Sequence, residues 1–237
     1  MHLQQHVCIC ETEDGFVLLD LRSERYIGIP RDAGIRLRRA ICNWPLSGDS
    51  AHSRAADVQS DSEELLQQLM SRGLIALDDG LQSWRSRSYP IAVPTSARSE
   101  HVSRETKVQM IDFINLVIAR MVTALKLRTR SLERIVLAVE RRKSRTARSD
   151  SADRSARIEQ MAAVYSRVRP LAFTARSACL VDSLMLIEFL ALYGLFPDWV
   201  IGVRTQPFLA HSWVQHDGRV LNDSLENVLG YVPILSV

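Results

Sequence analysis

The sequence predicts an α+β protein made of two domains joined by a linker. Short strand-forming runs separated by turn residues fill the first thirty positions, and two helical patterns and a short strand at 74–77 follow. Ser, Arg and Pro then dominate positions 83–105, which we interpret as the linker. Beyond it, helical patterns lead into a further helix and then a hairpin. Strands and helices grouped in this way are typical of the α+β class, here with domains at 1–82 and 106–237.

The first domain begins with a predicted three-stranded meander. Its strands are expected in three runs rich in β-forming residues, at positions 6–10, 16–21 and 25–29. Asp14-Gly15 supplies turn chemistry between the first two runs. Asp32 and Asp61 are expected to cap two helices, the second ending at Gly73 before a short strand at 74–77. Three strands with helices on one face predict a winged-helix-like module of about 80 residues, a size that can fold alone.

Composition narrows the function classes. A net charge of +3 gives no reason to expect nucleic acid or another polyanion as a partner. The N-terminus lacks the layout of a signal peptide and the four cysteines are irregularly spaced, so we expect a reduced, cytoplasmic protein. Cys8 and Cys10 have no second Cys or His pair at zinc-ligand spacing, so no metal site is predicted. We expect both on one face of a strand as small apolar residues.

The most apolar segment, positions 108–127, is expected to form a buried helix. Four polar residues interrupt it, so it falls short of a membrane span; these are Asp112, Asn115, Arg120 and Lys126. A second helix is expected over 132–142. The basic, Ser-rich run at 141–157 is interpreted as a solvated loop or helix end and not as a binding patch, because charge runs are usually solvated.

The last 60 residues carry the residues suited to chemistry. Strong helix formers run from Cys179 to Tyr193 and stop at Gly194, with apolar residues almost all round, which predicts a central buried helix. Ser177 is the expected N-cap and places Cys179 in the first turn. There the helix dipole favours the thiolate, the nucleophilic form of cysteine. A lone cysteine is more often structural, so the position alone does not establish a role.

A β-hairpin with Asp217-Gly218 at its turn is predicted after this helix. A two-residue loop would turn Asp223 to the face away from His211. A three-residue loop, with the glycine in the left-handed conformation, would pair Gln215 with Arg219 and set His211 opposite Asp223. Side chains opposed in this way are close enough for a carboxylate to hold an imidazole. We predict the second register.

A cysteine at a helix start and a His–Asp pair on a hairpin supply the three roles of a thiol protease. Cys179 would attack the carbonyl carbon of the substrate. His211 would form an ion pair with it and protonate the leaving amine, and Asp223 would fix the orientation and tautomer of the ring. The backbone N–H of Cys179 is the expected first donor to the oxyanion.

Other polar or aromatic residues of this segment have simpler interpretations. His216 lies at the hairpin tip, where an exposed histidine is the ordinary outcome. Asp182 lies in the first turn of the helix, where a carboxylate complements the dipole. Trp213 is expected on the face of His211, where it would either shield the site from water or serve only as core.

These motifs resemble those of the lasso-peptide B proteins. The similar segments are Cys179-Leu180-x-x-Ser183-Leu184, Gly202-Val203-Arg204 and Pro207-Phe208-x-Ala210-His211-x-Trp213-Val214 followed by Asp223. The Cys-to-His and His-to-Asp spacings also fit. The resemblance implies a transglutaminase-like, papain-related cysteine peptidase domain over 106–237. By its order of elements, the first domain resembles the precursor-recognition element of ribosomal peptide pathways.

The resemblance also implies how a substrate is held. The recognition element would bind the leader of a precursor peptide as an extra strand at the edge formed by 25–29, against the helix near 63–72. Backbone hydrogen bonds would give affinity and side-chain pockets selectivity. The residues expected to line this site, each equally suited to be plain core, are Tyr26, Ile27, Ile29, Leu66 and Met70.

The implied function is leader removal in lasso-peptide maturation. The peptidase would cut after a threonine that is next to last in the leader, and the freed amine would pass to a cyclase resembling asparagine synthetase. That partner uses ATP, which is also a possible requirement for efficient processing; no intrinsic cofactor is expected. Two other functions stay open: a non-catalytic chaperone that binds the precursor, and a transglutaminase-like acyltransferase that uses the same three residues.

Overall fold

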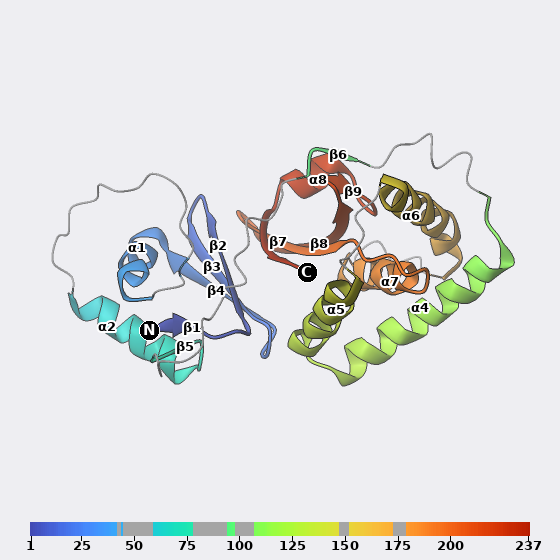
Figure 1. The fold of residues 1–237 in the computed structure, drawn as a ribbon. Helices are drawn as coiled ribbons and strands as arrows, with labels where there is room; N and C mark the ends of the chain where they lie inside the picture. The colour runs from blue at the N-terminus through green and yellow to red at the C-terminus, as the bar shows by residue number, and fades with distance from the viewer. Residues whose placement is uncertain (42–43, 45–58, 78–93, 98–106, 147–151, 173–178) are drawn as a thin grey trace. The chain divides into compact units, whose positions relative to one another are not determined.

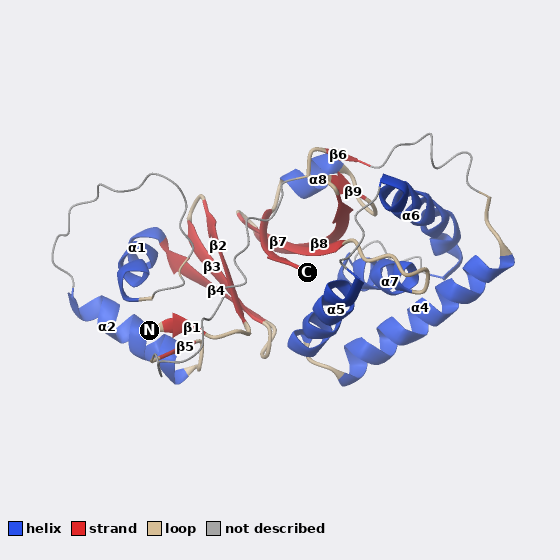
Figure 2. Cartoon of the chain, in the orientation of Figure 1, coloured by secondary structure: helices blue, strands red, loops and turns tan. Residues whose placement is uncertain are grey.

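The computed structural model describes residues 1–41, 44, 59–77, 94–97, 107–146, 152–172 and 179–237 (Figure 1). The chain divides into two compact units, residues 1–90 with 205–208, and residues 91–204 with 209–237. Both units mix helices with strands (Figure 2), so the predicted α+β class is confirmed.

The first unit contains the predicted meander. Three antiparallel strands lie in the order β2 (Val7–Thr12), β3 (Gly15–Asp20) and β4 (Arg25–Pro30). Gly15 has φ +149°, and a Cβ there would lie 2.4 Å from the carbonyl oxygen of Ile29, so only glycine fits between the strands. Because β4 has no strand beyond it, one edge of this sheet is open among the described residues.

Two helices and a small two-stranded sheet complete this unit. Their bounds are α1 (Arg31–Ala40), α2 (Gln59–Ser71), β1 (His2–Leu3) and β5 (Ile75–Ala76). The predicted caps at Asp32 and Asp61 are wrong, because both helices begin earlier in the chain and each aspartate lies inside the first turn. The predicted stop at Gly73 is confirmed: its φ is +68°, and the N–H of Leu74 bonds back to the carbonyl oxygen of Leu69 at 2.9 Å.

The second unit is built on a five-stranded sheet. Its strands are β6 (Ser96–Ala97), β7 (Asp198–Thr205), β8 (Phe208–His216), β9 (Arg219–Val220) and β10 (Val232–Ser236), in the order β10-β7-β8-β9-β6. β6 pairs in parallel with β9, and the N–H of Thr95 bonds to the carbonyl oxygen of Gly218 at 2.8 Å. This part of the predicted linker is therefore a strand: once the sheet supplies partners for its backbone, polar composition does not keep a segment out of it.

The helices of the second unit gather beside this sheet (Figure 1). Their bounds are α4 (Met110–Thr129), α5 (Leu132–Thr146), α6 (Ala152–Ala172), α7 (Cys179–Ala191) and the short α8 (Leu225–Leu229). α7 packs against both α4 and α6. Its residues 182–190 are all buried, which confirms the predicted central helix. At its end, Gly194 has φ +72° and the N–H of Leu195 bonds to the carbonyl oxygen of Leu190 at 3.0 Å, as expected for a glycine stop.

Buried charges of the helical layer are paired. The carboxylate of Glu188, 5% exposed on α7, accepts hydrogen bonds from Lys126 at 2.6 Å and from both terminal nitrogens of Arg142 at 2.6 and 2.9 Å. Lys143 forms an ion pair with Asp198. Arg142 and Lys143, at the start of the basic run, therefore hold α5 to α7 and β7. Composition alone does not indicate this role.

The prediction that 108–127 forms a buried helix is half wrong. A helix forms, but only one face of α4 is buried, the face carrying Asp112, Leu116, Ala119 and Thr123. The opposite face carries large apolar side chains that are 39–76% exposed. Among the described residues, no helix is long and apolar enough to cross a membrane. Apolar content predicted burial, but α6 and α7 cover only one side of the helix.

Candidate active site

Cys179 is the first residue of α7, so its predicted place at a helix start is confirmed. Its side chain is partly buried. The predicted cap, Ser177, lies outside the described residues. α7 is fixed to the sheet close to this end, because the hydroxyl of Ser183 donates to the carbonyl oxygen of Ser212 at 2.8 Å. The indole N–H of Trp199 donates to the hydroxyl of the same Ser212 at 2.8 Å. The nucleophile candidate therefore stands on a helix anchored to the strand that carries His211.

The predicted register of the hairpin is wrong. His216 pairs with Arg219 and Gln215 with Val220, so the loop has two residues and not three. Asp217 has φ +47° and Gly218 φ +72°, the two left-handed residues of a type I′ turn. This turn matches the twist of the flanking strands, and an Asp-Gly pair adopts it readily.

His211 contacts Asp223 although the predicted register is wrong. His211 Nε2 lies 2.5 Å from Asp223 Oδ2. The strand after the turn, β9, ends at Val220, so Asp223 belongs to a segment that has already left the ladder. Strand alternation therefore does not govern where its side chain points. Our prediction failed because it assumed that the strand continued to Asp223.

The side chain of Asn222 determines how the segment that carries Asp223 leaves the sheet. Its side-chain oxygen accepts the backbone N–H of Val214 at 2.8 Å, which replaces a ladder bond. Its side-chain nitrogen donates to Asp182 at 3.1 Å and to Ser183 at 3.2 Å, both on α7. One amide thus ties β8, α7 and the segment bearing Asp223 together. Asn222 is not predicted from the sequence, where its only signal is an amide beside the predicted aspartate.

The carboxylate of Asp223 is held by several donors. Its Oδ1 accepts the backbone N–H of Ser224 at 2.7 Å, and its Oδ2 accepts the side chain of Asn227 at 3.0 Å as well as the ring of His211. Burial opposes its charge, but the hydrogen bonds with His211, Ser224 and Asn227 together lower the pKa of Asp223. Asn227 was also missed from the sequence, although it lies one helical turn after the aspartate.

The thiol of Cys179 and the imidazole of His211 each shift the pKa of the other toward its charged form. The hydrogen bond with His211 is the largest cause that lowers the pKa of Cys179; burial opposes it, and the backbone of Ser212 assists. Burial disfavours the charged form of His211, but the hydrogen bonds with Asp223 and then with Cys179 outweigh it and raise its pKa to about 9. Because Nε2 faces Asp223, Nδ1 is the ring nitrogen left for the thiol. This arrangement can deliver a nucleophile on one side and a proton on the other.

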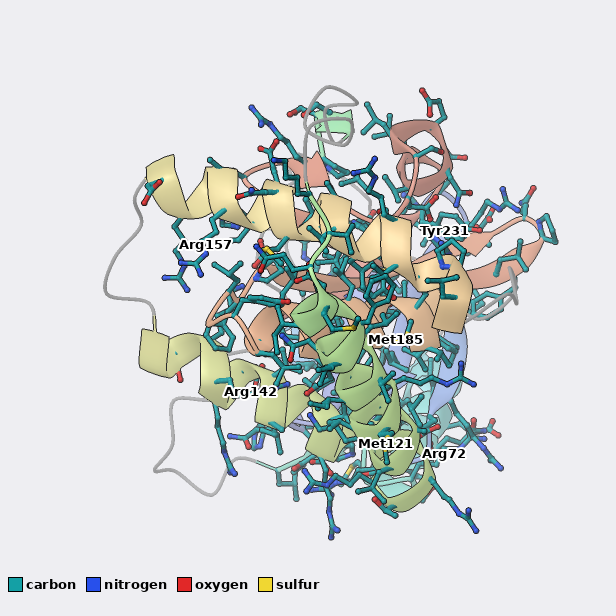
Figure 3. The ribbon with its side chains drawn as sticks, turned by 90° about the vertical axis from the view of Figure 1, so that its right-hand side faces the viewer. Arg72, Met121, Arg142, Arg157, Met185 and Tyr231 are labelled. Carbon is teal, nitrogen blue, oxygen red and sulfur yellow. The ribbon has the colours of Figure 1, made fainter. Side chains whose placement is uncertain are left out.

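Aromatic rings enclose the imidazole. Trp213 is fully buried and stacks on His211 with 6.1 Å between ring centroids, so its predicted place on the face of His211 is confirmed. Gly202 makes room for it, since a Cβ there would lie 2.8 Å from the indole. Tyr231, labelled in Figure 3, lies 5.0 Å from the imidazole, and the guanidinium of Arg204 lies 5.5 Å from the tyrosine ring. Sequence spacing gave no signal for Tyr231.

Asp182 and His216, the other polar residues considered in this segment, have different hydrogen-bond partners. Asp182 is 5% exposed, accepts the hydroxyl of Tyr165 at 2.8 Å and pairs with Arg169 at 2.6 Å. It anchors α7 to α6, beyond the simple dipole role that we expected. His216 Nε2 lies 3.1 Å from the hydroxyl of Ser155 and 3.4 Å from Asp217, at the hairpin tip.

The five residues expected to bind a leader are only partly brought together. Tyr26 and Ile27, on the edge strand β4, line a cavity of about 360 Å³ together with Arg72 at the end of α2. Ile29 is 3% exposed and belongs to the core of the first unit. Leu66 and Met70 pack against that core and are not among the residues lining the cavity. Ile27 and Ile29 share a face of β4, and Ile27 also packs against this core. Ile29 and Tyr26 line a second cavity of about 390 Å³.

Cys8 and Cys10 lie on the same face of β2, opposite Leu19 and Val17, and both are buried. Burial is the main cause that raises the pKa of Cys10 to about 12, which leaves an unreactive thiol. Within the described parts of the chain, no three His, Cys, Asp or Glu side chains gather as metal ligands would.

Two comparisons with known proteins found relatives of this chain. The family model described as the transglutaminase-like superfamily matches residues 117–236. The Microcin J25-processing protein McjB of Escherichia coli is 47% identical over 49 residues, which are 21% of this chain and 24% of McjB. The matched region thus spans about a quarter of that relative. No solved structure matches the chain. The two matches confirm the resemblance that the motifs indicated.

Proposed function

Since this chain belongs to the transglutaminase-like superfamily, whose model matches residues 117–236, we propose that it is a cysteine peptidase that removes the leader from a lasso-peptide precursor. The observation that carries the proposal is the chain of contacts from Cys179 through His211 to Asp223, with the pKa of the thiol lowered and that of the imidazole raised. The name of the partial relative McjB, a processing protein, supports the same role.

The proposed reaction has two stages. The thiolate of Cys179 attacks the carbonyl carbon of the last leader residue, and the oxyanion accepts the backbone N–H of Cys179. Protonated His211 then gives its proton to the departing amine of the core peptide, leaving a thioester between the leader and Cys179. In the second stage His211 takes a proton from water, the resulting hydroxide attacks the thioester, and the leader leaves as a carboxylic acid. Asp223 orients the ring throughout and transfers no proton.

Leader binding is assigned to the first unit. We propose that it is a winged-helix-like precursor-recognition element and that the leader adds a strand at the open edge of β4. An edge strand offers unpaired backbone groups to an incoming peptide, and the cavity beside Tyr26 and Ile27 supplies a side-chain pocket. Binding on the same chain raises the effective concentration of the scissile bond at Cys179.

The proposal extends to partners and place of action. The freed core amine would pass to an asparagine-synthetase-like cyclase that uses ATP, and the chain itself would use no cofactor. A threonine would stand next to last in the leader, one residue before the residue whose carbonyl carbon is attacked. We place the reaction in the cytoplasm, where thiols stay reduced.

Mass spectrometry of a precursor incubated with the protein tests the proposed function. Two products are expected, a leader with a free carboxylate and an intact core, and Cys179→Ala should yield neither while still binding the leader. The reaction should be run alone and with cyclase and ATP, since processing could depend on them. Precursor bound but uncut under both conditions would indicate a chaperone. A leader joined to an added amine would indicate an acyltransferase, which the same three residues could also support.

A further inference from the structure

The exposed face of α4 forms a continuous apolar stripe. Its large side chains are Met110, Ile111, Ile114, Val117, Ile118, Met121 and Leu125. Figure 3 shows this helix in front, with Met121 labelled on it. Along the stripe no exposed charge intervenes, because Arg120 lies to one side and Arg128 stands at the end. The proposed peptidase chemistry uses none of these residues.

The spacing within the stripe is that of a helix-pairing seam. Ile111, Ile114, Ile118, Met121 and Leu125 follow one another at alternating steps of three and four residues. This is the a/d pattern that lets side chains of one helix fit between those of a neighbouring helix. A helix that lies in a membrane surface instead needs a solvated polar face opposite the apolar one. The opposite face of α4 is buried against its own unit.

The stripe is large enough to form an interface. Its seven side chains, 39–76% exposed, offer on the order of 500 Å² of apolar surface. The largest patch on a typical monomer is about 300–600 Å². Two such stripes facing each other would bury about 1,000 Å², the area at which specific interfaces begin.

We propose that α4 pairs with α4 of a second copy of this chain, in an antiparallel arrangement about a two-fold axis. A seam of uniform apolar residues is its own complement, and a two-fold interface uses the same surface twice. Arg128 occupies the seam position that follows Leu125. A parallel pair would bring Arg128 against its own copy, with Arg130 beside it, whereas an antiparallel pair keeps these like charges apart. In the antiparallel pair, Ile118 faces Met121 of the other copy and Ile114 faces Leu125.

The molar mass of the full-length protein in solution tests the pairing. Light scattering after size-exclusion chromatography should give twice the mass of one chain. Ile118→Glu should give a single chain with unchanged helical circular dichroism, since the side chain is exposed in the single chain. Leu171→Glu is the matched control: it changes a leucine that is 75% exposed on α6 and should leave the dimer intact. Ile114→Lys repeats the test with the opposite charge.

Cross-linking tests the orientation. Met121→Cys, near the two-fold axis, should be joined to its copy by a short bismaleimide, whereas Met110→Cys, at the far end of the seam, should not. Wild-type protein, with its native cysteines, is the baseline. Efficient linking of Met110→Cys would refute the antiparallel arrangement. A wild-type protein of single mass, or a dimer that Ile118→Glu leaves intact, would overturn the pairing, as would a single chain that binds anionic vesicles through this stripe. Because these readouts do not depend on cleavage, they stand apart from the peptidase proposal.

Discussion

His211 interacts with the carboxylate of Asp223 and with the thiol of Cys179. Nε2 bonds to a carboxylate that several donors hold in place, and Nδ1 is left for the thiol. The imidazole therefore cannot rotate without losing the bond to Asp223, and its charge is stabilised from both sides. Stacking on Trp213 limits the ring further. The chemistry of the site thus depends on how firmly this one side chain is oriented.

The reactivity of Cys179 should depend on pH in a manner set by His211. In the wild type the thiolate persists below the ordinary pKa of a thiol because the protonated imidazole stabilises it. Above pH about 9 His211 loses its proton, so leaving-group protonation and hence cleavage should decline. Iodoacetamide alkylation should show the apparent thiol pKa rising in His211→Ala. An unchanged alkylation profile in that variant would contradict the ion pair.

Removing each of the three residues should have unequal effects on cleavage. Cys179→Ala should abolish it, and His211→Ala should reduce kcat by about 10²–10⁴-fold, the range for loss of a general acid–base. Asp223→Ala should retain more activity than either, because it orients and does not transfer a proton. Single-turnover cleavage of the precursor measures all three. Leader binding, followed by fluorescence anisotropy, should stay unchanged in each variant; a matching loss of binding would argue against separate binding and cutting units.

Among the elements, the hairpin and α7 depend on each other through Asn222. Its amide replaces a ladder bond to β8 and reaches two residues of α7, so it sets the position of the segment that carries Asp223. The sequence predicts the hairpin, its turn residues and the buried helix with the cysteine at its start. It does not predict how Asp223 reaches His211, because the end of β9 is determined by this side chain and not by a local pattern.

Asn222→Ala should lower kcat by about 10–100-fold, because the carboxylate and the imidazole lose their fixed geometry. Asn222→Asp is the matched comparison, since it keeps the acceptor for Val214 but loses the donor to Asp182. Single-turnover cleavage gives kcat, and the alkylation profile of Cys179 should move toward that of a free thiol if orientation is the cause. A loss of thermal stability with an unchanged alkylation profile would mean that Asn222 is only structural.

Glu188 and Asp198 should differ strongly in their contribution to the free energy of unfolding. Glu188→Ala leaves Lys126 and Arg142 without their buried partner and should destabilise the protein by about 3–5 kcal/mol. Asp198→Ala removes a more exposed ion pair with Lys143 and should change stability by about 0–1 kcal/mol. Urea unfolding followed by circular dichroism measures both. Equal effects would mean that burial does not set the strength of these pairs.

At the scale of the whole molecule, the sequence predicts some features of the two units better than others. The meander and the triad residues are read from turn residues and motif spacing, and the structure brings Cys179, His211 and Asp223 together. The predicted leader-binding residues stay a prediction: Tyr26 and Ile27 line the cavity beside β4, whereas Leu66 and Met70 pack against the core. Apolar content also misplaced α4, since a sequence shows that a helix is apolar but not whether its own chain covers every face.

Binding and cutting should be separable by mutation. Arg72→Glu, which reverses a charge beside the cavity next to β4, should weaken leader binding by about tenfold, or about 1.4 kcal/mol. Arg39→Glu makes the same change at an exposed position on α1 and is the control. Calorimetric titration with the leader gives the Kd, and kcat at saturating precursor should be unchanged. Wild-type affinity in Arg72→Glu would place the leader elsewhere.

The early end of β9 has a consequence for how such hairpins can change during evolution. In a continuous ladder, inserting two residues restores the facing of every later side chain, because the pattern repeats every second residue. Leu221 still donates its N–H to the carbonyl oxygen of Val214 at 2.9 Å, but Asn222 and Asp223 have no such repeat, since a side-chain amide and not the ladder determines their path. We therefore expect an insertion of any length in this segment to displace Asp223. An insertion of two residues in the strands before it would keep the facing of the later side chains.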